Sequence, residues 1–223
     1  MLQPVIYQEN MTFLKLGIAQ KSRELTARLT QSIDAQAEDL YFVLQHDIEW
    51  CGDPKAFYEK ELPYRLDSIA RRDLRHLSEM ISQGFTNNLC WLQDNLRRLG
   101  IRNFNMDFQD YQLRADGEQY EKLNLIDIHK TKLMARVGTL ITAICFSGFG
   151  LGVFAASILG GIFVEEGLLS RSKKSKQQIL NVLPTIVDNY KEQLKIHIIE
   201  AISLPKANII NTLNNISYEQ IGV

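Results

Sequence analysis

Apolar residues recur every three or four positions along the first quarter of the chain, with charged side chains between them. The series covers residues 12–50 and consists of Leu14, Ile18, Leu25, Leu29, Ile33, Ala37, Leu40, Leu44 and Ile48. This spacing predicts one amphipathic helix. It is longer than the usual globular helix of about 8 to 20 residues, which favours an elongated bundle or a coiled coil. Cys51-Gly52-Asp53-Pro54 should end it, because proline cannot continue the hydrogen-bond ladder.

A second helix is predicted from about residue 63 to 99, where Gly100 is placed to close it with a left-handed residue. Two helices of similar length joined by a short break should lie antiparallel. In residues 103–125, Phe104, Met106 and Phe108 alternate with polar residues before the Asp116-Gly117 turn signal. This segment predicts either a small β-hairpin or irregular structure.

The remaining pattern is also helical. A third helix is expected to begin near Asp127. A last amphipathic helix is predicted from the spacing of Ile179, Leu183, Val187, Tyr190, Leu194, Ile198 and Ile202. Pro184 should kink that helix or mark its true first turn, and the Asn-rich tail after Pro205 should be less regular. The predicted fold is all-α: an elongated antiparallel bundle with an apolar, glycine-rich helical hairpin. Its segments are a long-helix region (1–135), the hairpin (136–170), and a basic patch with a returning C-terminal helix (171–223).

The distinctive feature is a stretch of about 28 residues, 137–164, without a formal charge. It exceeds the roughly 18 to 20 residues that make a candidate membrane span. A buried core helix is the alternative. However, the stretch carries six glycines, each costing a helix up to about 1 kcal/mol relative to alanine. The sequence therefore favours entry into a membrane.

Charges flanking the stretch predict its topology. Basic residues stand on both sides, and lysine and arginine favour the cytoplasmic side and anionic headgroups. A re-entrant hairpin, which returns to the side it left, fits this better than a single span. The candidate headgroup contacts are Lys130, Lys132, Arg136, Arg171, Lys173, Lys174 and Lys176.

Two further groups of candidates lie inside the stretch. The predicted membrane-inserting residues are Leu140, Ile141, Ile144, Phe146, Phe149, Leu151, Val153, Phe154, Ile158, Leu159, Ile162 and Phe163. The predicted helix-packing or turn residues are Gly148, Gly150, Gly152, Ala156 and Gly160. Small residues four apart allow close helix approach in lipid, whereas three glycines within five residues also suit a turn.

Composition narrows the function further. Lysine and arginine total 25 against 26 for aspartate and glutamate, which disfavours a nucleic-acid partner. Three widely spaced cysteines and an N-terminus without a secretory pattern favour the cytoplasm. Residues 150–155 match a dinucleotide-binding glycine pattern only weakly, and His46 with Glu49 lacks further metal ligands. We expect no cofactor, no metal and no catalytic site, and core positions for Trp50 and Trp91.

The arrangement resembles the C-terminal half of bacterial dynamin-like proteins. The resemblance rests on residues 132–139 leading into the apolar 140–163, followed by the basic patch and the helix from Ile179. It implies a helical stalk, a membrane-binding paddle at 140–163, and headgroup contacts at 171–176. A dynamin P-loop, G-x-x-x-x-G-K-[ST], is missing from this sequence, so we expect no GTP hydrolysis by this chain.

Three functions remain open. The leading hypothesis is a membrane-associating protein, peripheral or re-entrant at the inner face of the plasma membrane, that binds anionic lipid or remodels membrane through homo-oligomers or a dynamin-like GTPase partner. The second is a pore-forming or membrane-disrupting protein whose bundle shields the hairpin until it inserts. The third is a soluble interaction module with 137–164 as a buried central helix.

Overall fold

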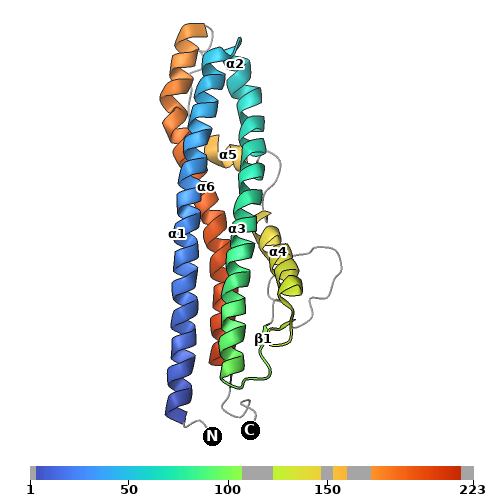
Figure 1. Ribbon diagram of the computed structural model, residues 1–223. Coiled ribbons are helices and arrows are strands. Elements are labelled where there is room, and N and C mark those ends of the chain that lie inside the picture. The colour runs from blue at the N-terminus through green and yellow to red at the C-terminus, as the bar shows by residue number, and fades with distance from the viewer. Residues whose placement is uncertain (1–3, 107–122, 147–152, 160–171, 217–223) are drawn as a thin grey trace. The chain divides into compact units, whose positions relative to one another are not determined.

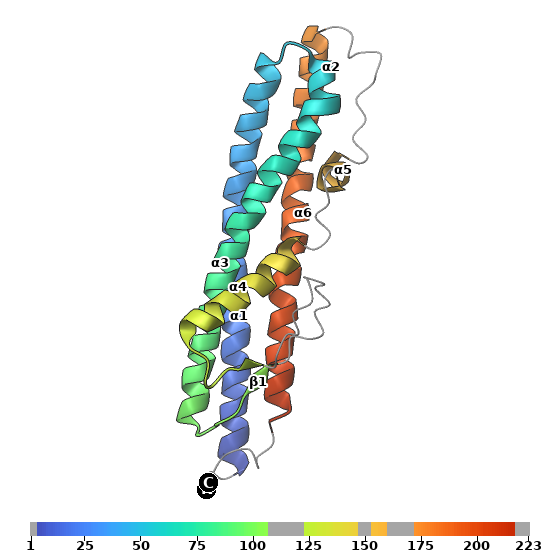
Figure 2. The same ribbon diagram turned by 90° about the vertical axis from the view of Figure 1, so that its right-hand side faces the viewer.

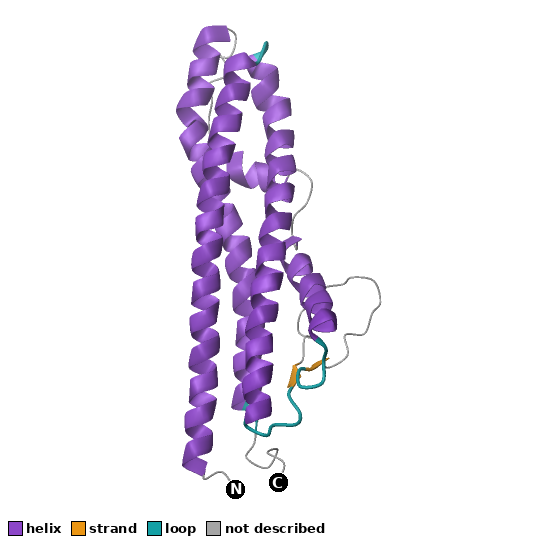
Figure 3. Ribbon diagram, viewed as in Figure 1, coloured by secondary structure: helices purple, strands orange, loops and turns teal. Residues whose placement is uncertain are grey.

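The described part of the chain is almost entirely helical. The structure, a computed structural model, describes residues 4–106, 123–146, 153–159 and 172–216 (Figure 1). Helices account for 89% of these residues, which confirms the predicted all-α class (Figure 3). The elements are α1 (Pro4–Trp50), α2 (Pro54–Ala56), the π-helical turn η1 (Phe57–Glu61), α3 (Leu62–Arg98), β1 (Asn105–Met106), β2 (Leu123–Asn124), α4 (Lys130–Phe146), α5 (Val153–Leu159) and α6 (Ser172–Asn214).

The chain divides into two compact units, and each of the three long helices contributes to both. Unit 1 contains Met1–Leu29, Ser78–Ser147 and Ile198–Val223, and so holds the β-strands and α4. Unit 2 contains Thr30–Leu77 and Gly148–His197, and so holds α2, η1 and α5. In each unit α1, α3 and α6 lie side by side, as two perpendicular views show (Figures 1 and 2).

The buried stripe of α1 follows the predicted pattern. It runs from Met11 to Ile48, and the buried Ser22 occupies the one position where the apolar series skips a turn. The mean step along the stripe is about 3.7 residues, slightly above the 3.6 of an α-helix and clearly above the 3.5 of a left-handed coiled coil. The helices therefore pack as a bundle without the heptad repeat of that coiled coil.

The return from α1 to α3 is built by the residues that the sequence indicated. Asp53 caps α2, because its Oδ1 accepts hydrogen bonds from the backbone N–H groups of Lys55 (3.0 Å) and Ala56 (3.1 Å). Pro54 follows at the first helical position, where its missing N–H costs nothing. At the other end of α3, Gly100 has φ = 75°, the left-handed conformation expected of it.

A short β-ladder precedes α4. Asn105 pairs with Asn124 and Met106 with Leu123 in antiparallel register, which confirms pairing between the two ends of the predicted hairpin segment. The proposed Asp116-Gly117 turn lies outside the described residues. On α3, the Gln93 amide donates hydrogen bonds to the carbonyls of residues 125, 126 and 128, at 2.8–3.1 Å. This buried side chain fixes the segment that leads into α4.

Helix α6 begins at Ser172, so of the two alternatives for Pro184 the structure excludes a first-turn position. The expectation of a less regular tail after Pro205 is wrong, because α6 continues to Asn214. Each proline removes one backbone donor, yet the apolar stripe persists beyond them and buries Ile209 and Leu213. Tertiary burial of these residues outweighs the local preference of proline and asparagine for irregular structure.

Close packing in unit 1 depends on a glycine. An alanine Cβ at Gly17 of α1 would overlap the indole of Trp91 on α3 and approach its Cζ2 to 2.9 Å. Phe13 and Lys21 hold the same indole, with a ring-centroid distance of 6.0 Å and a Lys21 Nζ-to-centroid distance of 5.2 Å. The indole thus occupies space that only glycine leaves open.

We predict that Gly17→Ala lowers the melting temperature, although alanine normally favours a helix by about 1 kcal/mol over glycine. The indole must move, so Trp91 fluorescence should shift to the red when measured in a Trp50→Phe background. Gly138→Ala is the matched control, because nothing lies within 4 Å of its added Cβ. A Gly17→Ala protein as stable as the control variant would contradict this packing.

Candidate functional site

Two described helices contain parts of the uncharged stretch. Helix α4 ends at Phe146, and α5 is a seven-residue helix, Val153–Leu159. No helix within the described part of the chain is both long and apolar enough to cross a membrane.

Helix α4 is amphipathic. One face is buried and consists of Leu133, Val137, Leu140, Ile141, Ile144 and Cys145. Burial raises the pKa of the Cys145 thiol to about 12, as expected for an apolar environment. The other face exposes Met134 and three basic side chains, while α4 contains no aspartate or glutamate. All charges on this outward face are therefore positive.

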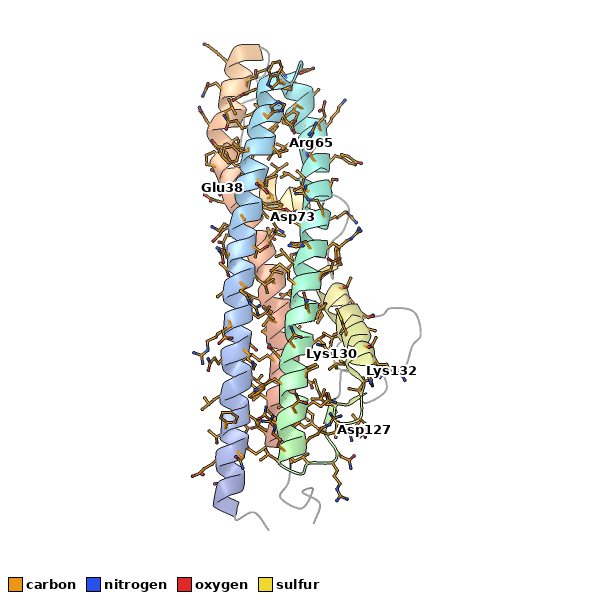
Figure 4. All side chains as sticks on the ribbon, viewed as in Figure 1. Glu38, Arg65, Asp73, Asp127, Lys130 and Lys132 are labelled. Atoms are coloured by element: carbon orange, nitrogen blue, oxygen red, sulfur yellow. The ribbon has the colours of Figure 1, made fainter. Side chains whose placement is uncertain are left out.

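Those basic side chains are predicted headgroup contacts, and their positions are unusual for a helix. Lys130, Lys132 and Arg136 are all exposed, and the two lysines lie in the first turn of α4, shortly after Asp127 (Figure 4). A helix N-terminus carries partial positive charge, so lysines there are electrostatically unfavourable. The helix itself gains nothing from these cations at its start.

Helix α5 is attached to unit 2 by polar contacts near both ends. The backbone N–H of Ala155 donates to Oδ1 of Asp67 on α3, at 3.1 Å. The Asn189 amide on α6 donates to the carbonyl of Ile158, at 2.8 Å. Ala155 and Ile158 are themselves buried, at 1% and 0% exposure. The helix thus lies against α3 and α6, with a carboxylate at its positive end and an amide donor at its negative end.

A second buried carboxylate lies six residues further along α3. Asp73 is 3% exposed and accepts hydrogen bonds from the Tyr190 hydroxyl on α6 (2.5 Å) and from Arg72 Nε (2.9 Å). Burial, together with the charge of Asp73, raises the pKa of Tyr190 well above its usual range. Helix α3 therefore carries two partnered carboxylates in unit 2. Asp67 accepts from α5, and Asp73, labelled in Figure 4, accepts from α6.

The second basic flank is only partly described. Lys174 is exposed, while Lys176 donates to the carbonyl of Glu49 at the C-terminal end of α1, at 2.8 Å. A cation at that position stabilises α1 by satisfying one of its last carbonyls. Lys176 therefore has a structural role beyond its predicted contact with lipid. Arg171 lies outside the described residues, and Lys173 lies in α6.

The predicted membrane-inserting residues fall into three groups. Leu140, Ile141, Ile144 and Ile158 are buried, and Phe146 and Leu159 are half-buried, so insertion requires these side chains to leave the contacts seen here. Val153 and Phe154 begin α5. Outside the described residues lie Phe149, Leu151, Ile162 and Phe163.

The predicted packing glycines are largely untested. Ala156 lies on the exposed side of α5, whereas Gly148, Gly150, Gly152 and Gly160 lie outside the described residues. Sequence reasoning missed Asp67 and Asn189 altogether. The available signal was the position of Asp67, a carboxylate directly beside Leu66 in the core stripe of α3.

The expectation of a core position for Trp50 is wrong. Its side chain is 77% exposed at the end of α1, beside the exposed His46, while Trp91 is half-buried. Trp50 falls off the stripe because Ile48 takes the last core position of α1. Among the residues that the structure describes, no three histidine, cysteine, aspartate or glutamate side chains form a possible metal site.

Comparison with known proteins identifies no relative. No family model matches the chain, and neither a curated protein nor a solved structure is significantly similar to it.

We predict that Asp67→Ala loosens α5 selectively. Its loss leaves the buried N–H of Ala155 without an acceptor, which costs about 1–3 kcal/mol. Hydrogen exchange of the α5 amides should accelerate at least tenfold, with the amides of α3 unchanged. Asp188→Ala, which removes an exposed carboxylate from α6, is the control. Equal exchange of α5 in both variants would show that Asp67 does not hold this helix.

Proposed function

We propose that this chain is a membrane-associating helical protein in which the bundle holds part of its apolar stretch in a docked state. The observation that carries the proposal is the attachment of α5. The middle of an uncharged 28-residue stretch forms a separate short helix, held by one hydrogen bond near each end. A segment attached in this way leaves the bundle at lower cost than a continuous core helix.

Magnitudes indicate that the docked state is favoured in the absence of lipid. Two hydrogen bonds contribute about 1 kcal/mol each, and burial of Ile158 and Ala155 adds about 2–4 kcal/mol. Leu140, Ile141 and Ile144 of α4 are also buried, and each adds about 1.5–3 kcal/mol. Inserting the twelve candidate side chains into lipid yields about 4–7 kcal/mol at most, so insertion of the whole stretch needs a further interaction.

Electrostatic attraction supplies that further interaction. The basic face of α4 precedes the stretch directly, and each lysine or arginine near an anionic surface contributes about 1 kcal/mol. Lys130 and Lys132 lie at the positive end of α4, where an anion placed beside them would relieve their unfavourable electrostatic position. Anionic membranes should therefore be bound and neutral ones should not.

The proposed protein would have the architecture of a dynamin-like stalk and paddle. In that picture the long helices self-associate or bind a GTPase partner, and residues 140–163 contact the inner face of the plasma membrane. Cytoplasmic residence and membrane remodelling belong to the same proposal.

Pore formation is the second candidate, and the burial of α5 favours it. A bundle that shields an apolar segment until it inserts would bury Ala155 and Ile158 in the closed state, as seen here. Release of a dye from anionic vesicles at protein concentrations that saturate binding would select pore formation. Binding with dye retention would select peripheral association.

We predict that the chain floats with vesicles containing phosphatidylserine and not with pure phosphatidylcholine. Replacing Lys130, Lys132 and Arg136 by glutamine should weaken binding more than tenfold, since three cations leave the surface that faces the headgroups. The measurement is a flotation isotherm at about 0.1 M salt, where such attraction is still effective.

Lys15, Arg23 and Arg28 of α1, replaced together by glutamine, provide the control. This variant has the same net charge change on a helix remote in sequence from the apolar stretch. If both triple variants weaken vesicle binding equally, the loss of binding follows from net charge alone, and α4 has no specific role. Failure of the unaltered protein to float would contradict the proposed function itself.

A further inference from the structure

Unit 2 contains a groove between α1 and α3 with a volume of about 890 Å³. Leu40, Phe42 and Val43 line it from α1. Tyr64 and Ile69 line it from α3. Phe42 is 60% exposed, Val43 46% and Tyr64 75%, so the groove presents aromatic and aliphatic side chains to the outside. Large apolar groups gathered in one exposed groove mark an interaction surface.

Charge is sorted between the two walls of this groove. Of the residues that line the groove, α1 contributes one charged side chain, Asp39, and α3 contributes Arg65 and Arg72. The π-helical turn η1 adds one charge of each sign, Lys60 and Glu61. The two carboxylates of α3 in unit 2, Asp67 and Asp73, are buried. The α1 wall is therefore acidic at Asp39, and the α3 wall is basic.

Contacts between α6 and the other helices of unit 2 are already bridged in the described residues. Helix α5 lies against α3 and α6 through Asp67 and Asn189. Lys191 forms an ion pair with Asp34, and Lys176 binds the carbonyl of Glu49, which joins α6 to α1. Between α1 and α3, the Arg65–Asp47 ion pair lies at one end of the apolar groove.

We propose that the α1–α3 groove of unit 2 is a homodimer interface, occupied by the same groove of a second copy. A two-fold axis parallel to the groove places α1 of each copy opposite α3 of the other, so that acidic walls meet basic walls. An axis across the groove would place α1 on α1 and oppose like charges, which costs free energy. The charge pattern therefore selects both the partner and its orientation.

The intramolecular ion pair fixes the register. Arg65 lies level with Asp47, and α1 and α3 are antiparallel, so seven residues along each helix bring Arg72 level with residue 40 (Figure 1). A two-fold axis along the groove preserves this level. Asp39 of one copy therefore meets Arg72 of the other, twice per dimer, with Phe42 and Tyr64 packed between them.

This inference deepens the proposed function by naming the surface through which the helical region self-associates. It is tested without lipid, so the two proposals fail separately. A dimer that does not bind vesicles contradicts the membrane function alone. A vesicle-binding monomer contradicts the dimer alone.

A charge exchange between copies tests the interface. Asp39→Arg and Arg72→Glu should each raise the dimer dissociation constant at least tenfold, because like charges then meet at both contacts. In an equimolar mixture of the two variants, each contact again joins Arg to an acid. Sedimentation equilibrium should show monomers for each variant alone and dimers for the mixture.

Arg72 also contacts Asp73, so circular dichroism must confirm that Arg72→Glu remains folded. If Arg72→Glu does not fold, a second pair of variants tests the interface. Phe42→Ser should abolish the dimer. Trp50→Ser, which changes an aromatic residue of the same helix outside the groove, should leave the dimer intact. A wild-type monomer at about 100 μM would overturn the proposal, since specific homodimers are stable well below that concentration. Asp39→Arg or Phe42→Ser dimers as strong as wild type would also overturn it.

Discussion

The proposed behaviour of the apolar stretch depends on the two hydrogen bonds that hold α5 near its ends. Asp67 accepts from the first turn of α5, and Asn189 donates to its last turn. Seven residues cannot form a stable helix alone, because helix nucleation is costly and few hydrogen bonds follow it. The contacts with α3 and α6 therefore determine whether α5 exists as a helix on the bundle. They also set the cost of removing it.

The total charge of this protein is nearly zero, but its charged residues are grouped by sign on separate surfaces. The net charge is −1, yet the charged residues of α4 are all cations, those of the unit 2 part of α1 are all carboxylates, and the charged residues of the unit 2 part of α3 that are not buried are all arginines. Charges grouped in this way affect the choice and orientation of a binding partner more than they affect binding affinity. The basic face of α4 suits an anionic surface, whereas the paired walls of the α1–α3 groove suit another copy of themselves.

Local signals in the sequence predicted the helical framework well. The apolar series of α1, the Gly52-Asp53-Pro54 break and Gly100 each act through neighbouring backbone, so their structural effects can be read from a few residues. The prolines of α6 misled prediction, because burial of Ile209 and Leu213 outweighs their local preference, and Trp50 misled it because Ile48 takes the last core position of α1. Asp67 and Asn189 were not found because their partners lie 88 and 31 residues away along the chain.

The most direct test of the account is the environment of α5 in the presence of lipid. An environment-sensitive NBD fluorophore on a cysteine placed at the exposed Ala156, in a protein whose native cysteines are replaced by serine, reports that environment. A label at the exposed Ala27 of α1 is the reference. The account predicts that phosphatidylserine vesicles shift the emission of the Ala156 label to the blue and expose it to quenchers within the acyl chains, while the Ala27 label stays in water. An Ala156 label that remains in water on vesicles to which the protein is bound would contradict insertion of the apolar stretch.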